Sequence, residues 1–249
     1  MMLREAEERI SYAVGHLSLG YIISKSASKV LRTEINLPLI FTLSVIPDID
    51  ILVPFIEHRG PTHSILAIFI IFIPVFALYG KRATPYLLAL IQHPLIGDYF
   101  VGGKIQLFWP VTTDQYGIEL GIKNPINVIA ETAMFLTLIL VMLKTKDIQN
   151  LLHSRKMTTI TLIIPIFTLI SPTLLKFPTD VPIPLIPPHL ILTIIFLLPV
   201  IIRFGILLRK LHRRLTAVYV LDSISVCAMR TTTLSYKIQK VTYCFRKGK

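Results

Sequence analysis

Histidine and aspartate side chains gather in four short groups near the start of the chain. The members of these groups that could ligate a metal ion are His16, Asp48, His58, His63, His93 and Asp98. Zinc accepts imidazole and carboxylate ligands, as do manganese and iron. Carboxylates crowded at the edge of an apolar layer repel one another, and a divalent cation replaces that repulsion with coordination. The pattern therefore predicts a bound divalent metal, zinc first, with manganese or iron as alternatives.

Three nearby residues could take part in catalysis. Arg59 could bind an anionic group such as phosphate through its planar guanidinium. A bound metal activates water near neutral pH, and Asp50 or Glu131 could accept the proton that this water loses. Glu131 could instead pair with Arg59 or His16, or orient a metal ligand.

Each of these residues also has a simpler explanation when it is taken alone. His16 could be a hydrogen-bonded packing residue, Asp48 or Asp50 a turn residue after Pro47, and Arg59 a side chain that reaches lipid head groups. Their shared membrane face favours a metal site over coincidence. A proton or ion pathway through the same residues remains the main alternative.

The elements that must position these residues are transmembrane helices. The chain is 53% hydrophobic, with a mean hydropathy of +0.67 and only 16% charged residues. A membrane-spanning helix needs about 20 mostly apolar residues. The sequence predicts an all-α, polytopic transmembrane bundle of about six to seven helices. The strong candidates are Asn36–Phe55, Ser64–Tyr79, Ile126–Leu143, Thr158–Leu175 and Ile183–Ile202, and the weaker ones are Ile10–Ser24 and Thr84–Ile96.

Charge indicates how these helices are oriented. If seven crossings alternate, one side holds most of the 26 Lys and Arg residues and only three acids, Glu34, Asp147 and Asp222. The positive-inside rule places that side in the cytoplasm, and the His/Asp groups then lie near the extracytoplasmic face of the cell membrane. The net charge of +12 is explained by anionic lipid head groups at the basic loops, so we expect no nucleic-acid partner.

The order of these motifs resembles a known family, the membrane-bound metal-dependent hydrolases of bacteria and archaea, which look distantly similar to zinc-dependent phospholipase C. The resemblance spans about residues 10–140. The motifs that carry it are His16, Pro47-Asp48-Ile49-Asp50, His58-Arg59-Gly60-Pro61-Thr62-His63-Ser64, His93-Pro94 with Asp98, and Trp109-Pro110. It implies five metal ligands, which are His16, Asp48, His63, His93 and Asp98. It further implies that Asp50 and His58 are ligands or support them.

The spacing of His93 and Asp98 departs from that of a regular helix. Ligand pairs on an α-helix sit best three or four residues apart, and these two are five apart, with Pro94 and Gly97 between them. A π-bulge, or a helix end at Gly97, would bring Asp98 back into line. The later residues His153, His189 and His212 match no such motif, so one or two metals are expected rather than three.

The leading hypothesis is an integral membrane hydrolase that uses metal-activated water on a small ester or lipid, with a phosphoester as the expected substrate. The alternatives are a transporter or ion pathway that uses the same residues, and a non-catalytic scaffold. Residues 1–143 are expected to form the metal-site bundle, capped by an aromatic loop from Val101 to Lys123. Residues 144–214 would add further transmembrane helices, and 215–249 would form a basic polar tail.

Overall fold

The computed structural model describes residues 12–53, 55–56, 58–154 and 157–212, so the expected basic tail lies outside the described residues. The described residues form helices and loops with no regular strand, which confirms the all-α class. By internal contacts the chain divides into two units, Met1–Arg203 and Phe204–Lys249. The described part of the second unit, residues 204–212, is helical.

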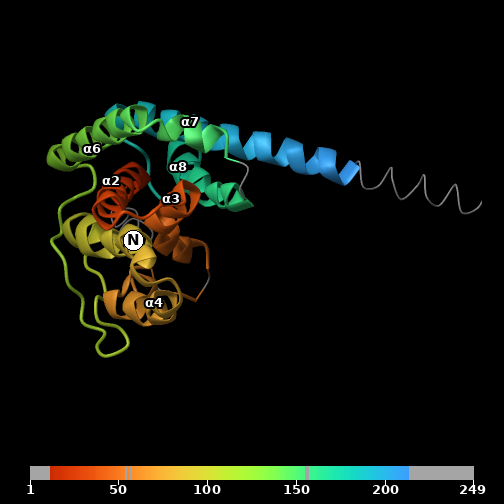
Figure 1. Cartoon of the computed structure of the whole chain (residues 1–249). Coiled ribbons are helices and arrows are strands. Elements are labelled where there is room, and N and C mark those ends of the chain that lie inside the picture. The colour runs from red at the N-terminus through yellow and green to blue at the C-terminus, as the bar shows by residue number, and fades with distance from the viewer. Residues whose placement is uncertain (1–11, 54, 57, 155–156, 213–249) are drawn as a thin grey trace, which may run out of the picture. The chain divides into compact units, whose positions relative to one another are not determined.

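Helix α2 (Ala13–Leu31) is the central element of the first unit (Figure 1). It packs against α3 (Leu37–Val45), α5 (Thr84–Gln92) and α6 (Pro125–Lys144). Small buried residues allow this close packing. A Cβ added to Gly20, for example, would lie 2.0 Å from Ser44 Oγ, so α2 and α3 approach closely at this point. The helix ends at Arg32, which adopts the left-handed conformation.

The predicted second crossing, Asn36–Phe55, is not a continuous transmembrane helix. The chain forms a nine-residue helix, α3 (Leu37–Val45), and then the 3₁₀-helix η1 (Ile46–Leu52). Pro47 has no backbone N–H and its ring clashes with the preceding turn, so the α-helix ends at Val45. Nine residues span only about 14 Å, roughly half of a bilayer core. This break places Asp48 and Asp50 inside the bundle, where both are buried.

The next two expected helices form a hairpin. Helix α4 (Ile65–Tyr79) leads through the 3₁₀-helix η3 (Gly80–Ala83) into α5 (Thr84–Gln92). Gly80 has a φ of +55°, a conformation that favours glycine, and the chain turns back there. Buried apolar residues join the two helices, among them Phe72 and Leu90. Beyond α5 lies a π-helix, η4 (His93–Asp98).

The second half of the bundle is largely apolar. It comprises α6 (Pro125–Lys144), α7 (Asp147–Leu152), the 3₁₀-helix η5 (Met157–Leu162), α8 (Ile163–Leu174), the 3₁₀-helix η6 (Ile183–Leu185) and a last helix that reaches His212. The main core cluster joins α2 and α3 to α6 and α8 through residues such as Tyr21, Phe41, Leu138 and Leu169.

Four described helical segments are long and apolar enough to cross a membrane: Ile65–Asp98, Pro125–Lys144, Met157–Leu174 and Ile183–His212. The first contains the α4–α5 hairpin. The weaker prediction Ile10–Ser24 corresponds to α2, which is longer than expected but is not among the four. Large exposed apolar side chains on α4, such as Ile71 and Leu78, are typical of a surface that faces lipid.

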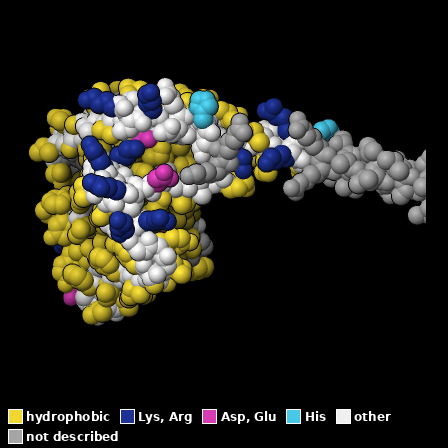
Figure 2. All heavy atoms as spheres, in the orientation of Figure 1, with side chains coloured by type: hydrophobic (Ala, Val, Ile, Leu, Met, Phe, Trp, Pro, Cys, Tyr) yellow, Lys and Arg dark blue, Asp and Glu magenta, His cyan; other side chains and the backbone are white. Residues whose placement is uncertain are grey.

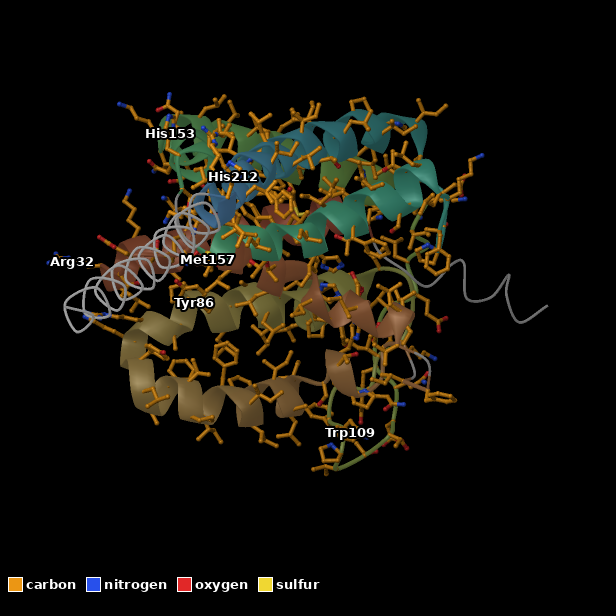
Figure 3. The ribbon with its side chains drawn as sticks, turned by 90° about the vertical axis from the view of Figure 1, so that its right-hand side faces the viewer. Arg32, Tyr86, Trp109, His153, Met157 and His212 are labelled. Carbon is orange, nitrogen blue, oxygen red and sulfur yellow. The ribbon has the colours of Figure 1, made fainter. Side chains whose placement is uncertain are left out.

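The two ends of the bundle differ in charge. Lys and Arg side chains gather on one face with few acidic side chains between them (Figure 2). The exposed basic residues at the C-terminal ends of α2 and α6 and at the hairpin turn are Lys29, Arg32, Lys81, Arg82, Lys144 and Lys146. Figure 3 shows Arg32 at this end of the bundle and Trp109 at the opposite end. His16 precedes Lys29 by 13 residues on α2, or roughly 20 Å along a helix.

Candidate metal centre

Four side chains from separate segments converge at the end of the bundle that is remote from the basic face. The residues are Asp48 of η1, His63 of the short 3₁₀-helix η2 (Pro61–His63), and His93 and Asp98 of η4. One potential ligand atom from each lies within 4.8 Å of all the others. His63 and His93 are fully buried, and Asp48 is 9% exposed. Two imidazoles and two carboxylates at this separation form a set that can hold one metal ion.

His93 is oriented by a backbone carbonyl. Its Nδ1 lies 2.8 Å from the carbonyl oxygen of Ser44, which can only accept a hydrogen bond. Neutral His93 therefore carries its proton on Nδ1 and presents the lone pair of Nε2. That atom faces Asp48 Oδ1 at 3.2 Å and Asp98 Oδ2 at 3.3 Å. A lone pair opposite two carboxylates requires a positive charge between them.

His63 repeats this arrangement with a carboxylate in place of the carbonyl. Its Nδ1 lies 3.3 Å from Asp50 Oδ2 and 3.0 Å from the Thr62 hydroxyl. Its Nε2 lies 3.0 Å from Asp98 Oδ2, yet it makes no hydrogen bond of good geometry to any described residue. Pairs of histidine and carboxylate of this kind commonly orient metal-ligating imidazoles.

Asp50 binds more than one neighbour. Oδ1 accepts from His58 Nδ1 at 2.8 Å, and Oδ2 accepts from the Thr62 hydroxyl. Burial would raise the pKa of Asp50, but the hydrogen bonds from His58 and His63 outweigh it and hold that pKa below its ordinary value. Asp50, His58 and His63 also form a second group with ligand atoms within 4.8 Å of one another. His63 belongs to both groups, with one ring nitrogen facing each.

The neighbouring carboxylates favour positive charge on His63. Burial alone would lower the pKa of His63, whereas the close carboxylates of Asp48, Asp50 and Asp98 raise it well above the ordinary value. The two histidines act in turn on Asp48: burial raises its pKa, but His93 and His63 lower that pKa by more than burial raises it. The site therefore attracts a cation, whether that cation is a proton or a metal.

His16 lies beside the group of four. Its ring stacks on that of His93, with centroids 3.8 Å apart and planes 20° apart, and its Nε2 lies 3.6 Å from Asp98 Oδ1. Gly97 makes room for it, because a Cβ at that position would meet His16 Cε1 at 2.1 Å. The predicted ligand His16 is thus next to the site without belonging to either group of converging atoms.

The five-residue spacing of His93 and Asp98 is resolved by η4, which is a π-helix over His93–Asp98. A π-helix has a wider turn than an α-helix, and residues five apart fall on one face. Both side chains consequently point to the same place, as the predicted bulge requires.

Arg59 supports Asp98. Its guanidinium is 3% exposed and donates to Asp98 Oδ1 at 3.1 Å, and to the carbonyl oxygens of Gly103 at 2.7 Å and Val101 at 3.1 Å. These bonds are made to the protein, and the contact with a substrate anion that the sequence suggests for Arg59 stays a prediction. They fix Oδ1, so that Oδ2 faces His63 and His93.

Glu131 of α6 stands apart from the converging ligand atoms. Asn127 donates to its Oε1 at 3.1 Å, and its carboxyl group lies against Gly15 in the first turn of α2. Among the roles that the sequence allows, this position favours orientation of the turn that carries His16. A carboxylate at a helix N-terminus also interacts favourably with the backbone amides there.

Several groups that support the site could not be predicted from the sequence. The carbonyls of Ser44, Val101 and Gly103 carry no sequence signal, because every residue has one. Thr62 lies within the predicted motif, next to His63. Its hydroxyl bridges Asp50 and His63, a role that its place beside a histidine could have suggested. The segment from Val101 to Lys123 was predicted to cap the site. It contacts the site residues through Arg59 and through Ser64, which donates to the carbonyl oxygen of Trp109 at 2.7 Å.

The fold and this site define an integral membrane protein, an apolar helical bundle with a buried His/Asp cluster at one end. A family model described as YdjM inner membrane protein matches residues 12–177, and the chain belongs to this family. The match covers the central helix, the cluster and α8. No curated protein and no solved structure is significantly similar to the chain.

This match corrects the resemblance drawn from the motifs. The family is that of YdjM inner membrane proteins, and nothing in the comparisons points to a phospholipase C-like hydrolase. The motifs were short, and their order alone could not distinguish one membrane family with an internal His/Asp cluster from another. The membrane location is supported both by the family and by the apolar helices.

Proposed function

We propose that the chain is a membrane-embedded, metal-dependent hydrolase that cleaves a phosphoester or a related ester. One observation carries the proposal: the Nε2 lone pairs of His63 and His93 converge with Oδ atoms of Asp48 and Asp98 within 4.8 Å. With neutral histidines, the negative charges of Asp48, Asp50 and Asp98 face only the positive charge of Arg59. One divalent cation would balance the two negative charges that remain, and zinc suits this ligand set.

The protein groups around such a cation have distinct tasks. A bound zinc would supply Lewis acidity and a water molecule that loses its proton near neutral pH. His58 is the base best placed to take that proton, since Asp50 holds its Nδ1 at 2.8 Å and its Nε2 has no hydrogen-bond partner among the described residues. Asp50 is then a positioning residue rather than the proton acceptor.

Metal analysis tests the proposal directly. Purified wild-type protein should bind at least about one zinc per chain, and His63→Ala should lose it. His189→Ala is the matched control, because His189 is equally buried but bonds only to the carbonyl oxygen of Leu185 in its own helix. A chelator should abolish hydrolysis in a panel of phosphoesters, and zinc should restore it.

Two results would contradict the proposal. Full hydrolytic activity in metal-free wild-type protein would remove the metal from the mechanism. Cation flux through liposomes, together with no hydrolysis of any ester, would favour the ion pathway instead.

We further propose that the cluster faces the extracytoplasmic side. The basic end of the bundle supports this orientation, because basic residues favour the cytoplasmic face. In a background with Cys227→Ser and Cys244→Ser, Glu119→Cys should react with an impermeant thiol reagent in intact cells. Lys81→Cys, at the hairpin turn, should react only after the cells are opened. The reverse pattern would invert the topology.

A further inference from the structure

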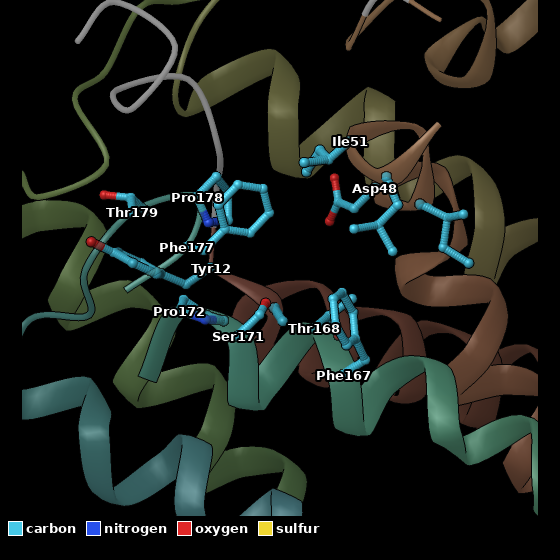
Figure 4. A pocket seen from close by; sticks show the side chains of 13 residues that line it. Tyr12, Asp48, Ile51, Phe167, Thr168, Ser171, Pro172, Phe177, Pro178 and Thr179 are labelled. Carbon is cyan, nitrogen blue, oxygen red and sulfur yellow. The ribbon is translucent and has the colours of Figure 1, made fainter. Parts of the chain in front are cut away.

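A pocket between η1 and α8 extends from the candidate metal centre. Asp48 lies in its wall together with Ile49, Ile51 and Leu52, and the opposite wall includes Phe167 and Phe177. Figure 4 shows the Asp48 carboxylate pointing into this pocket, with Phe177 and Pro178 across from it. The cavity between these walls has a volume of about 40 Å³, so the pocket is a narrow, partly open groove.

The walls of the pocket are mainly apolar, and their few polar groups are largely engaged elsewhere. The Thr168 hydroxyl donates to the carbonyl oxygen of Pro165, and the Tyr12 hydroxyl donates to that of Asp180. Asp48 is thus the one ionised side chain among the pocket's lining residues. A polar solute would gain little along such walls, whereas a hydrocarbon chain would bury apolar surface.

The position of the pocket agrees with an occupant drawn from the bilayer. One wall belongs to α8, within the candidate span Met157–Leu174. Phe167, which lines the pocket, is 41% exposed. An apolar span that bears one wall of the pocket is consistent with an occupant of lipid character.

We infer that the pocket binds the hydrocarbon chain of an amphipathic ester whose anionic head lies at the metal centre. The inference rests on the proposed function and specifies its substrate class. Each buried methylene strengthens binding by about fourfold, so even a few buried methylenes discriminate strongly between long and short chains. The head group is held at one end by the cation and the chain at the other by α8 and η1.

Two esters with the same leaving group test this inference. Wild-type protein should hydrolyse 4-nitrophenyl dodecyl phosphate with a kcat/KM at least about tenfold above that of 4-nitrophenyl methyl phosphate. Thr168→Phe, which fills the pocket, should remove most of this preference while retaining bound zinc. Thr173→Phe is the matched control, since it makes the same change at another half-buried threonine of α8 that also bonds to its own helix and lies outside the pocket.

A second measurement is independent of turnover. Dodecyl phosphate with a photoreactive diazirine at the chain end should label peptides that contain Ile49–Leu52 and Phe167–Thr179. Labelling should fall in Thr168→Phe and persist in Thr173→Phe. Labelling without hydrolysis would retain the pocket and reject the hydrolase. Equal hydrolysis of both esters, with labelling unchanged by Thr168→Phe, would retain the hydrolase and overturn the inference.

Discussion

The His16 ring stacks on the His93 ring with centroids 3.8 Å apart, and Gly97 lies directly against the same His16 ring. Through His16, helix α2 therefore supports the His93 imidazole, whose Nε2 faces Asp48 and Asp98. Although His16 lies outside the converging atoms, it belongs to the packing that fixes them.

Gly97→Ala should weaken metal binding by about 10–100-fold, the range for loss of an orienting group around a metal. The new Cβ would meet His16 Cε1 at 2.1 Å, so the ring must move and cease to stack on His93. Zinc affinity, measured by competition with a chelating dye, checks this. Gly121→Ala is the control, since its Cβ would meet nothing within 4 Å. Equal affinities in the two variants would show that His16 does not orient the site.

Arg59→Lys should lower both stability and zinc affinity, even though the charge is retained. An ammonium group cannot reproduce the fork that bonds Asp98, Gly103 and Val101 together. We expect a loss of about 1–3 kcal/mol in unfolding free energy, because buried acceptors lose partners. Thermal unfolding and dye competition measure the two effects. If Arg59 instead contacts substrate, Arg59→Lys would raise KM and leave zinc affinity unchanged.

Glu131→Gln should destabilise the protein by about 1 kcal/mol and leave zinc affinity nearly unchanged. The carboxyl group contacts the start of α2 and Asn127, and none of the converging ligand atoms. Thermal unfolding and metal titration on the same samples separate these effects. Loss of hydrolysis at full zinc occupancy and unchanged stability would restore a role for Glu131 as general base.

Asp147 provides a pH-dependent prediction at the basic end of the bundle. Burial raises its pKa, but bonds from Lys25 and from the Tyr21 hydroxyl, the latter at 2.7 Å, outweigh this and lower it. A lowered pKa stabilises the fold above the ordinary carboxyl value of about 4, and the stabilisation is lost as the pH falls through the lowered value.

Asp147→Asn should therefore lower Tm at pH 7, and the difference from wild type should shrink towards pH 3. Thermal unfolding across this pH range measures it, with the exposed Asp114→Asn as control. A difference independent of pH would mean that the Asp147 charge contributes nothing.

The fold class and the main site residues could be predicted because their signals are local. Long apolar runs predict helices, and ionisable groups at the ends of those runs are unusual enough to stand out. The spacing of His93 and Asp98 allowed a π-bulge or a helix end at Gly97, and the structure has a π-helix there. The sequence did not predict the helix break at Pro47. Apolar residues lie on both sides of this proline, so the segment resembles one continuous transmembrane helix, whereas α3 ends at Val45.

The contacts of Arg59 within the protein could not be predicted for a different reason. Its partners are the carbonyl oxygens of Val101 and Gly103, more than 40 residues away in the chain, and an aspartate that has other neighbours. A sequence shows that an arginine lies beside a histidine motif, but not that a loop folds back to occupy its guanidinium.

The π-helix has a consequence for the loop as well as for the ligands. Deleting one residue between His93 and Asp98 would give the four-residue spacing that suits an ordinary α-helix, so the ligand pair alone does not require the insertion. The deletion would, however, rotate the following chain by about 100° and shift it by about 1.5 Å. The Val101 and Gly103 carbonyls would then miss the Arg59 guanidinium. The additional residue thus sets the position of the loop that begins at Val101. A chain shortened by one residue would keep a suitable ligand spacing but lose the contacts between this loop and Arg59.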